Sequence, residues 1–390
     1  MNNQHFDHIV MNPPYNRNLH LDFFNKAVTM ADEVICIHPS APFFNRRPVR
    51  EQKRVIKFKE NIRDNMTSMH LLDGNLYFSA GLFVPLSITH TSTCAVHQDG
   101  MVQVTGLIED TMRWDKLNYF GSWVEYMYDN VPEKNLLNSQ NAQGNYFVNI
   151  GLIRGHVPVA GQMFNADMFT MVPKEYKVEY EPNLKWHHYG FDTEQQANNF
   201  LNYLKSDYAR IWLALYKNNQ HLDSGTLASV PYPDVEQPFC EATAFEEMGW
   251  SYNTAVDMGV LPYYNNETYG SYSSGVHTQD VNRTYSVRDN ERAKETHEVF
   301  TPQVIVDMML DMVTDWGCFL DPACGDGNIL VRIAERRLEM GHDPEEIAHN
   351  LYGFDIVESN VIACRNRLTK LLGFGTVFEE QILCKNYLGD

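Results

Sequence analysis

The sequence has no closely spaced pair of cysteines. Its cysteines stand at positions 36, 94, 240, 318, 324, 364 and 384, an odd number without a Cys-x-x-Cys pair. This spacing argues against a disulfide framework and against a zinc site. We therefore expect reduced thiols, as in a cytosolic protein.

The sequence also lacks an apolar run long enough to span a bilayer. Its first 20 residues carry polar and charged groups throughout, so we expect no signal peptide. Internal repeats and low-complexity tracts are absent as well. With 390 residues and 44% apolar content, the chain can bury a full α/β core and one further domain.

Positive charge is scarce, since 31 Lys and Arg stand against 50 Asp and Glu, a formal net charge of −19. This balance is unfavourable for a nucleic-acid binder, whose affinity depends largely on phosphate neutralisation. Residues 46–59, however, contain one acid, Glu51, among seven basic side chains: Arg46, Arg47, Arg50, Lys53, Arg54, Lys57 and Lys59. The run is either a solvated helix face or a phosphate-binding surface. Its position after the motif described next favours phosphate binding.

Near the N-terminus, an apolar strand leads into a tetrapeptide stiffened by two prolines. Residues 6–11 form the expected strand, and Asn12-Pro13-Pro14-Tyr15 follows it. The Asn12 side-chain oxygen and the Pro13 carbonyl can both accept hydrogen bonds from an aromatic amino group. This favours a tetrahedral nitrogen whose lone pair can attack a methyl donor, and the prolines hold both acceptors in place. Tyr15 offers a face on which an extruded base can stack.

Near the C-terminus, a second apolar strand runs into a glycine loop and the start of a helix. Residues 318–321 form the expected strand, and Asp321 begins the sequence Asp-Pro-Ala-Cys-Gly-Asp-Gly-Asn. The Asp321 carboxylate can face an ammonium group, while Gly325 and Gly327 let the backbone pass close under a cofactor. Asp355, at the end of the next expected strand, can accept hydrogen bonds from ribose hydroxyls. These features suit S-adenosylmethionine (SAM).

Nicotinamide dinucleotide is the competing cofactor for such a loop. It would require G-x-G-x-x-G and an acid about 20 residues beyond. Here Leu330 occupies the position of the third glycine, and Asp355 lies further along the chain than this pattern requires. A plain Pro-Pro turn is the structural alternative for residues 12–15. The joint occurrence of this tetrapeptide with the glycine loop disfavours that alternative. SAM is the better fit.

Periodicity predicts the elements around these motifs. We expect strands over 33–38, 82–91, 351–356 and about 376–383. Helices are expected over 19–31, about 50–66, 194–216 and 328–340, and a further helix follows strand 351–356 and ends at residue 372. A further helix is expected to begin with Thr301 as N-cap and Pro302 as its first residue. Alternating strands and helices are typical of a parallel sheet covered by helices. Residues 234–290 show little periodicity and suggest a linker or arm.

Together the two motifs resemble the catalytic domain of N6-adenine DNA methyltransferases, especially those of type II and type IIG restriction–modification systems. In that family a Phe-Thr-Pro element precedes the SAM loop, and residues 300–302 match it. The resemblance implies an α/β, Rossmann-like SAM-dependent methyltransferase sheet. It also implies double-stranded DNA as partner, with neither a membrane nor a metal. The residues assigned to SAM are Phe300, Thr301, Pro302, Asp321, Pro322, Ala323, Cys324, Gly325, Gly327, Asp355, Ile356 and Asn386.

The order of the motifs is the reverse of the more familiar arrangement, so the chain resembles a circularly permuted member of the family. We assign 1–96 to the catalytic half, 97–235 to an inserted target-recognition domain, 236–296 to a linker or arm, and 297–390 to the SAM-binding half. In unpermuted relatives a short loop would follow residue 388 and lead to a strand like 6–12. We therefore expect the two termini to lie close together.

The recognition domain rests on a looser resemblance around residues 191–234. It is expected to contact DNA through a cluster of hydrogen-bonding side chains: Lys217, Asn218, Gln220 and His221. The catalytic half is expected to add phosphate contacts from its basic run: Arg46, Arg47, Arg50 and Lys53.

Asn386 is a departure from the family pattern. The family commonly has an Asp-Phe-Leu-like element whose acid contacts the adenine amino group of SAM, and the matching stretch here is Asn386-Tyr387-Leu388. An asparagine oxygen can still accept that hydrogen bond, but without charge assistance. We expect weaker SAM binding as a result.

The sequence thus predicts a site-specific DNA adenine-N6 methyltransferase, in the cytoplasm of a bacterial, archaeal or phage-infected cell. Cytosine-N4 methylation is the close alternative, because both bases present a similar ring amino group. Glutamine methylation of a protein is a third, which the recognition-like segment and the basic run oppose. A non-catalytic DNA-binding decoy or regulatory subunit is a fourth, opposed by Asn12 and Asp321. The recognised site, a cognate restriction enzyme and a homodimer all remain open.

Overall fold

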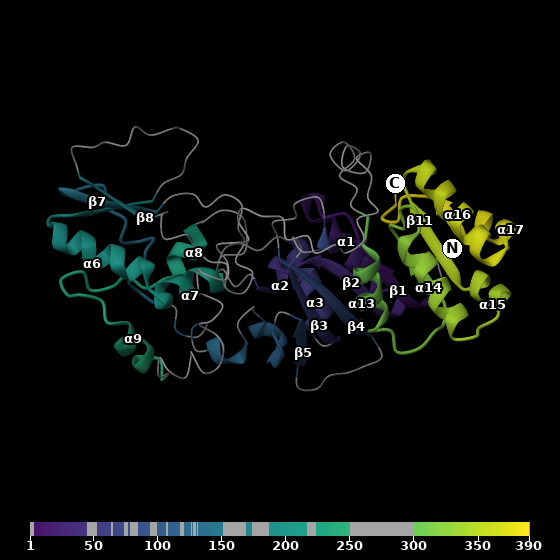
Figure 1. The fold of residues 1–390 in the computed structure, drawn as a ribbon, viewed down its shortest axis with the longest axis horizontal. Coiled ribbons are helices and arrows are strands. Elements are labelled where there is room, and N and C mark those ends of the chain that lie inside the picture. Colours follow the sequence, from purple (N-terminus) through teal and green to yellow (C-terminus); the bar gives the residue numbers. More distant parts are fainter. Residues whose placement is uncertain are drawn as a thin grey trace.

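The computed structural model describes residues 4–44, 53–63, 65–73, 77–78, 85–93, 100–106, 108–117, 121–125, 127, 130, 132–150, 169–173, 187–216, 224–249 and 300–389. They form a mixed α/β structure with one sheet of nine strands and one of three. Figure 1 shows the small sheet and its helices at one end, the C-terminal helices at the other, and strands of the large sheet between them.

The large sheet has the order β12-β11-β10-β1-β2-β4-β3-β5-β6. Its first five strands in this order are mutually parallel. β4 is antiparallel to both its neighbours, and β6 is antiparallel to β5. The strands are β1 (Phe6–Met11), β2 (Ala31–Pro39), β3 (Met66–Asp73), β4 (Pro85–Ser92), β5 (Met101–Gly106), β6 (Asp110–Arg113), β10 (Phe319–Asp321), β11 (Leu351–Asp355) and β12 (Ile382–Cys384). This is the Rossmann-like α/β architecture expected from the sequence.

The pairing of β1 with β10 joins the two ends of the chain. His8 lies opposite Phe319 and Ile9 opposite Leu320 in parallel register. Both strands are covered on both faces, which explains their nearly continuous apolar sequences. Their carboxyl ends therefore lie side by side at one edge of the sheet.

Helices cover both faces of the large sheet. One face packs against α13 (Gln303–Leu310), α14 (Asn328–Glu339), α15 (Pro344–His349), α16 (Glu358–Leu372) and α17 (Gly375–Gln381). The other packs against α1 (Leu19–Ala27) and α3 (Lys53–Arg63). α14 follows β10 and α1 follows β1, so the chain leaves these neighbouring strands toward opposite faces. Such a topological switch point opens a crevice where ligands bind in α/β sheets.

The second unit has its own core. Its sheet has the order β8-β7-β9, with β7 (Tyr146–Ile150), β8 (Phe169–Pro173) and β9 (His187–Phe191). Its helices are α6 (Glu194–Lys205), α7 (Asp207–Tyr216), α8 (Ser224–Ser229) and α9 (Glu241–Glu247). Tyr189, Phe200 and Phe245 are among its buried side chains. A capping box between Thr193 and Gln196 begins α6.

The structure corrects three expected elements. The helix over 194–216 is two helices, because the Ser206 hydroxyl donates to Tyr203 O at the end of α6 and accepts from Ala209 N at the start of α7. The strand expected over 376–383 is mostly the helix α17, and only β12 remains extended. The N-cap of α13 is Pro302 rather than Thr301, since Pro302 itself has extended backbone angles.

The large sheet also reaches further along the chain than the boundary placed at residue 96. β5 and β6 complete this sheet from within the segment 97–235. Conversely, α9 lies within the segment expected to be a linker, yet Phe245 and Met248 pack in the core of the smaller unit. Neither feature shows a clear periodicity in the sequence, because short strands and short helices carry few apolar positions.

Candidate active site

The motifs from the two ends of the chain meet at the carboxyl edge of the large sheet. Asp321 is the last residue of β10, Asp355 is the last residue of β11, and Asn12 follows β1 directly. Because these neighbouring strands are parallel, their ends lie at the same edge. A hydrogen bond from Asn12 Nδ2 to Thr301 Oγ1, 3.0 Å long, joins the tetrapeptide to the Phe-Thr-Pro element.

The Asn12 side chain is held from both ends of its amide. Its nitrogen donates to Thr301, and its oxygen accepts from the Tyr15 hydroxyl at 2.9 Å. The same hydroxyl lies 3.4 Å from Ile37 O at the end of β2. Burial, with a smaller contribution from Cys36, raises the pKa of Tyr15 well above its usual value, so the phenol keeps its proton near neutrality. Tyr15 therefore presents its hydroxyl to Asn12.

A buried histidine, His20, adjoins Tyr15 and was missed by the sequence analysis. Its ring meets the Tyr15 ring edge to face, with centroids 5.8 Å apart, and it is only 2% exposed. No group of the described residues forms a hydrogen bond with either ring nitrogen. Burial lowers the pKa of His20 to about 4, so the ring is neutral. Its place in the first turn of the helix after Tyr15 is the signal that could have found it.

The glycine loop depends on two left-handed backbone positions. Gly325 has a φ of 54° and Gly327 a φ of 94°. A Cβ on Gly325 would lie 3.3 Å from the Phe300 ring, and one on Gly327 would lie 2.6 Å from Cys364 Sγ. The Phe300 ring therefore packs close to the loop. The loop fits close passage of the backbone under a cofactor.

Two carboxylates frame this loop. Asp355 accepts hydrogen bonds from Gly325 N at 3.0 Å and from Val357 N at 2.8 Å. Asp321 is buried, and Ala323 N donates to it at 3.0 Å. Burial raises the pKa of Asp321 to about 8, the Ala323 hydrogen bond opposes this, and the nearby Asp355 adds to it. A neighbouring cation would therefore stabilise the ionised form of Asp321.

The other residues expected to hold SAM differ in the exposure and hydrogen bonding of their side chains. Ile356 is 73% exposed, an apolar side chain open at the site edge. Cys324 is buried, and a Cβ on Gly353 would lie 3.1 Å from its sulfur. Its side chain thus faces the core, and only its backbone lines the loop. Asn386 forms a local turn, accepting from Leu388 N at 3.1 Å and donating to Gly389 O at 2.6 Å.

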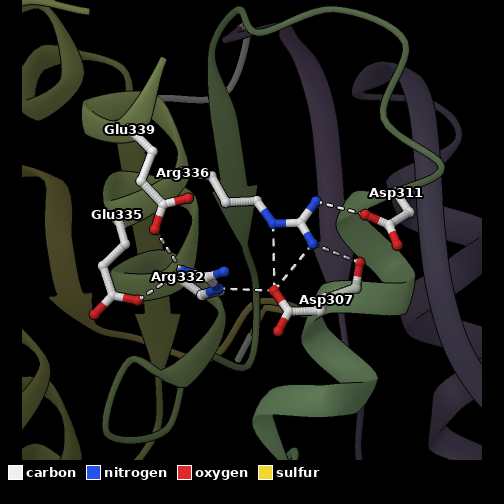
Figure 2. A network of polar contacts seen from close by, with 6 residues as sticks. All are labelled: Asp307, Asp311, Arg332, Glu335, Arg336 and Glu339. Atoms are coloured by element: carbon white, nitrogen blue, oxygen red, sulfur yellow. Dashed lines mark hydrogen bonds and ion pairs between the residues drawn. The ribbon is translucent and has the colours of Figure 1, made fainter. Parts of the chain in front are cut away.

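An ion-pair network, here called the Asp307 network, joins α13 to α14 (Figure 2). Asp307 Oδ1 accepts from Arg332 Nε at 2.7 Å and from Arg336 Nη2 at 3.0 Å. Arg336 also reaches Asp311, and Arg332 reaches Glu335 and Glu339. α13 follows the Phe-Thr-Pro element and α14 begins at the glycine loop, so the network fixes one relative to the other.

Of the residues expected to contact DNA, only Lys53 lies within the described part of the chain. Arg46, Arg47, Arg50, Lys217, Asn218, Gln220 and His221 lie outside the described residues. α3 packs through Phe58 and Ile62, which leaves Lys53 and Lys57 exposed on its outer face. Arg54 instead pairs with Asp22 at 3.2 Å.

Within the described ranges, no group of three or more His, Cys, Asp or Glu side chains could hold a metal ion. None of the helices described above is long and apolar enough to cross a membrane.

Comparison with known proteins concerns the C-terminal part of the chain. Residues 285–369 match the N-6 DNA methylase family. The match includes α13, β10, the glycine loop, α14, α15, β11 and most of α16. No curated protein matches the chain. The matched segment, which carries the glycine loop of the candidate site, is thus similar to DNA methyltransferases of the N-6 DNA methylase family.

Proposed function

We propose that the protein transfers a methyl group from SAM to the N6 amino group of adenine at specific sites in double-stranded DNA. The observation that carries this proposal is the hydrogen bond between Asn12 and Thr301 at the topological switch point. With this bond, the two acceptors that we propose for the amino group would lie beside the glycine loop. A single pocket there can bring both reactants together.

The residues around the loop fit SAM by their chemistry. Asp321 would face the ammonium group, Asp355 the ribose hydroxyls, and the exposed Ile356 side chain the adenine ring. Phe300 would cover the cofactor from the side of α13. When bound, SAM supplies an electrophilic methyl group. Asn386 supports this assignment least, because its amide is already engaged in a local turn.

Asn12 and Pro13 would bind the amino group of the target base. The Asn12 side-chain oxygen and the Pro13 carbonyl accept its two hydrogens, which favours a tetrahedral nitrogen with an available lone pair. Positioned acceptors of this kind stabilise the charge that develops on the nitrogen. The base must first leave the helix stack, because its amino group is otherwise paired. Tyr15 would contact the extruded base through its ring.

The sheet order supports circular permutation. Counted from β10, the strands run β10, β11, β12, β1 and β2, and their spatial order becomes 3-2-1-4-5. This is the order of a doubly wound nucleotide-binding fold. The Tyr387 ring is tilted against the Phe23 ring with centroids 5.3 Å apart, and Lys26 Nζ lies 4.7 Å from the centroid of the Tyr387 ring. The last described segment therefore packs on the first helix.

The short loop expected between the two ends stays a prediction, and the strand directions bear on its form. β12 and β1 belong to the same run of parallel strands. Parallel strands of one sheet require a crossover connection rather than a tight loop.

We assign sequence recognition to the smaller unit around β7, β8 and β9. It has its own core and comes from the middle of the chain, between the two halves of the site. A separate unit of this kind can carry base contacts while the large sheet carries the chemistry.

The direct test is to incubate the purified protein with plasmid DNA and SAM and to analyse the digested nucleosides by mass spectrometry. We expect N6-methyladenine, confined to one sequence context when the DNA is sequenced for methylation. N4-methylcytosine would establish the alternative base. DNA and SAM binding without any methylated base would favour the decoy alternative and overturn the proposal.

A further inference from the structure

Thr301 lies between the cofactor loop and the amino-group acceptor. It is 6% exposed, and its hydroxyl accepts the hydrogen bond from Asn12 across 289 residues of sequence. Its carbonyl accepts from Asn328 Nδ2 at 3.2 Å. The residue therefore contacts both halves of the site.

The Asn328 end of this connection is fixed to the glycine loop. Arg367 on α16 donates to Asn328 Oδ1 at 2.7 Å and to Asp326 O at 3.0 Å. It also pairs with the Asp326 carboxylate at 3.0 Å. A continuous series of hydrogen bonds thus runs from the glycine loop through Thr301 to Asn12 and Tyr15.

The orientation of the Asn12 amide decides its chemistry. A carboxamide has an acceptor end and a donor end of nearly the same shape. In the opposite orientation, its NH2 group would face the amino group of the base, donor against donor. The Tyr15 hydroxyl donates to the oxygen and Thr301 accepts from the nitrogen, so the two contacts together hold the amide in the orientation seen here.

We infer that Thr301 is a positioning residue for methyl transfer, which holds the oxygen of Asn12 toward the target amino group. This inference rests on the proposed function. It goes beyond the cofactor contact that the resemblance implied for Thr301. It also couples the glycine loop to the acceptor, because one residue is bonded to both.

The test uses Thr301→Val, which keeps the shape and removes the hydroxyl, and Thr301→Ser, which keeps the hydroxyl. Loss of a directly positioned group costs on the order of 10²–10³ in rate. For the indirect role of Thr301 we expect a fall in kcat of roughly 10-fold to 100-fold in Thr301→Val, and recovery in Thr301→Ser. SAM affinity, measured by calorimetry, should stay within about threefold in both variants. Thr301→Ala serves the same comparison if Thr301→Val does not fold.

A double-mutant cycle separates positioning from cofactor binding. In an Asn12→Ala background, Thr301→Val should slow methyl transfer no further, because there is no amide left to orient. Full additivity of the two losses, or a loss of SAM affinity as large as the loss of rate, would overturn the inference. Undiminished transfer by Thr301→Val would also overturn it and leave the proposed function intact. An unmutated protein that transfers no methyl to DNA would overturn the proposed function itself, and the inference with it.

Discussion

At the scale of single residues, the site combines acceptors that are held in place with acids whose protonation burial controls. Asn12 is fixed from both ends of its amide, and Asp321 is buried beside the glycine loop. Ligand binding would affect the two groups differently, because one is set by position and the other by protonation. Asn12 is already in position, whereas Asp321 must lose a proton to face a cation.

SAM binding should therefore release a proton from Asp321. Since the pKa of this acid is about 8 without a ligand, it is protonated below that pH, and an ammonium group favours the carboxylate. SAM affinity should rise with pH between about 5.5 and 7, by up to about tenfold per unit. Calorimetry in buffers of different ionisation enthalpy measures the released proton. The same experiment on Asp321→Asn is the control, and an equal pH dependence there would contradict this role.

His20 should make folding stability depend on pH. Its pKa is about 4 in the folded state and 6.5 ordinarily, so the unfolded chain binds the extra proton between these values. Its contribution to stability is thus complete above about pH 6.5 and is lost as pH falls toward 4, at up to about 1.4 kcal/mol per unit. Urea unfolding at several pH values should show a shallower slope for His20→Gln. An unchanged slope would mean that His20 does not titrate in this range.

At the scale of elements, strands packed on both faces could be predicted from the sequence, whereas strands with polar positions could not. β1, β10 and β11 were predicted because strands buried on both faces give continuous apolar sequences. β3, β5 and β6 were not, since their polar positions broke that pattern. α17 was taken for a strand because Val377 and Phe378 favour extended structure locally. Tertiary contacts of Phe378 and Gln381 decide for a helix instead.

The Asp307 network should stabilise the fold and the cofactor site together. Asp307→Asn removes the charge that pairs with Arg332 and Arg336, so we expect a loss of about 1 kcal/mol and weaker SAM binding. Glu339→Gln is the matched control, because Glu339 is 65% exposed at the edge of the same network. Thermal unfolding and SAM titration measure both effects. Equal effects of the two variants would contradict a special role of Asp307.

At the scale of the whole molecule, the sequence predicted the positions of the two motifs better than the contacts that connect them. Asn12 and Asp321 could be assigned because each motif carries its own chemistry in consecutive residues. Arg367, which donates to Asp326 O in the glycine loop, and His20, whose ring contacts the Tyr15 ring, could not be assigned, since such contacts depend on long-range packing. The net charge of −19 does not favour DNA binding. The exposed face of α3, which carries Lys53 and Lys57, is our candidate for phosphate contacts.

Lys53 and Lys57 should contribute to DNA binding without sequence preference. If each contacts one phosphate, replacing both with Ala should flatten the plot of log binding constant against log salt by about 1.8. Lys370→Ala on α16 is the control, an exposed lysine on a helix of the opposite face. Fluorescence anisotropy at several salt concentrations measures the slopes. A slope unchanged in the double variant would make this helix face an ordinary solvated surface.

Methyl transfer as proposed depends on Asn12 and the glycine loop forming one active site from two ends of the chain. The most direct measurement is the single-turnover rate of methyl transfer to DNA by Asn12→Ala at saturating SAM, with SAM affinity determined in parallel. We predict a rate lower by on the order of 10²–10³, with N6-methyladenine as the product of the unmutated protein and little change in SAM affinity. Transfer to adenine at an undiminished rate in Asn12→Ala would contradict the account.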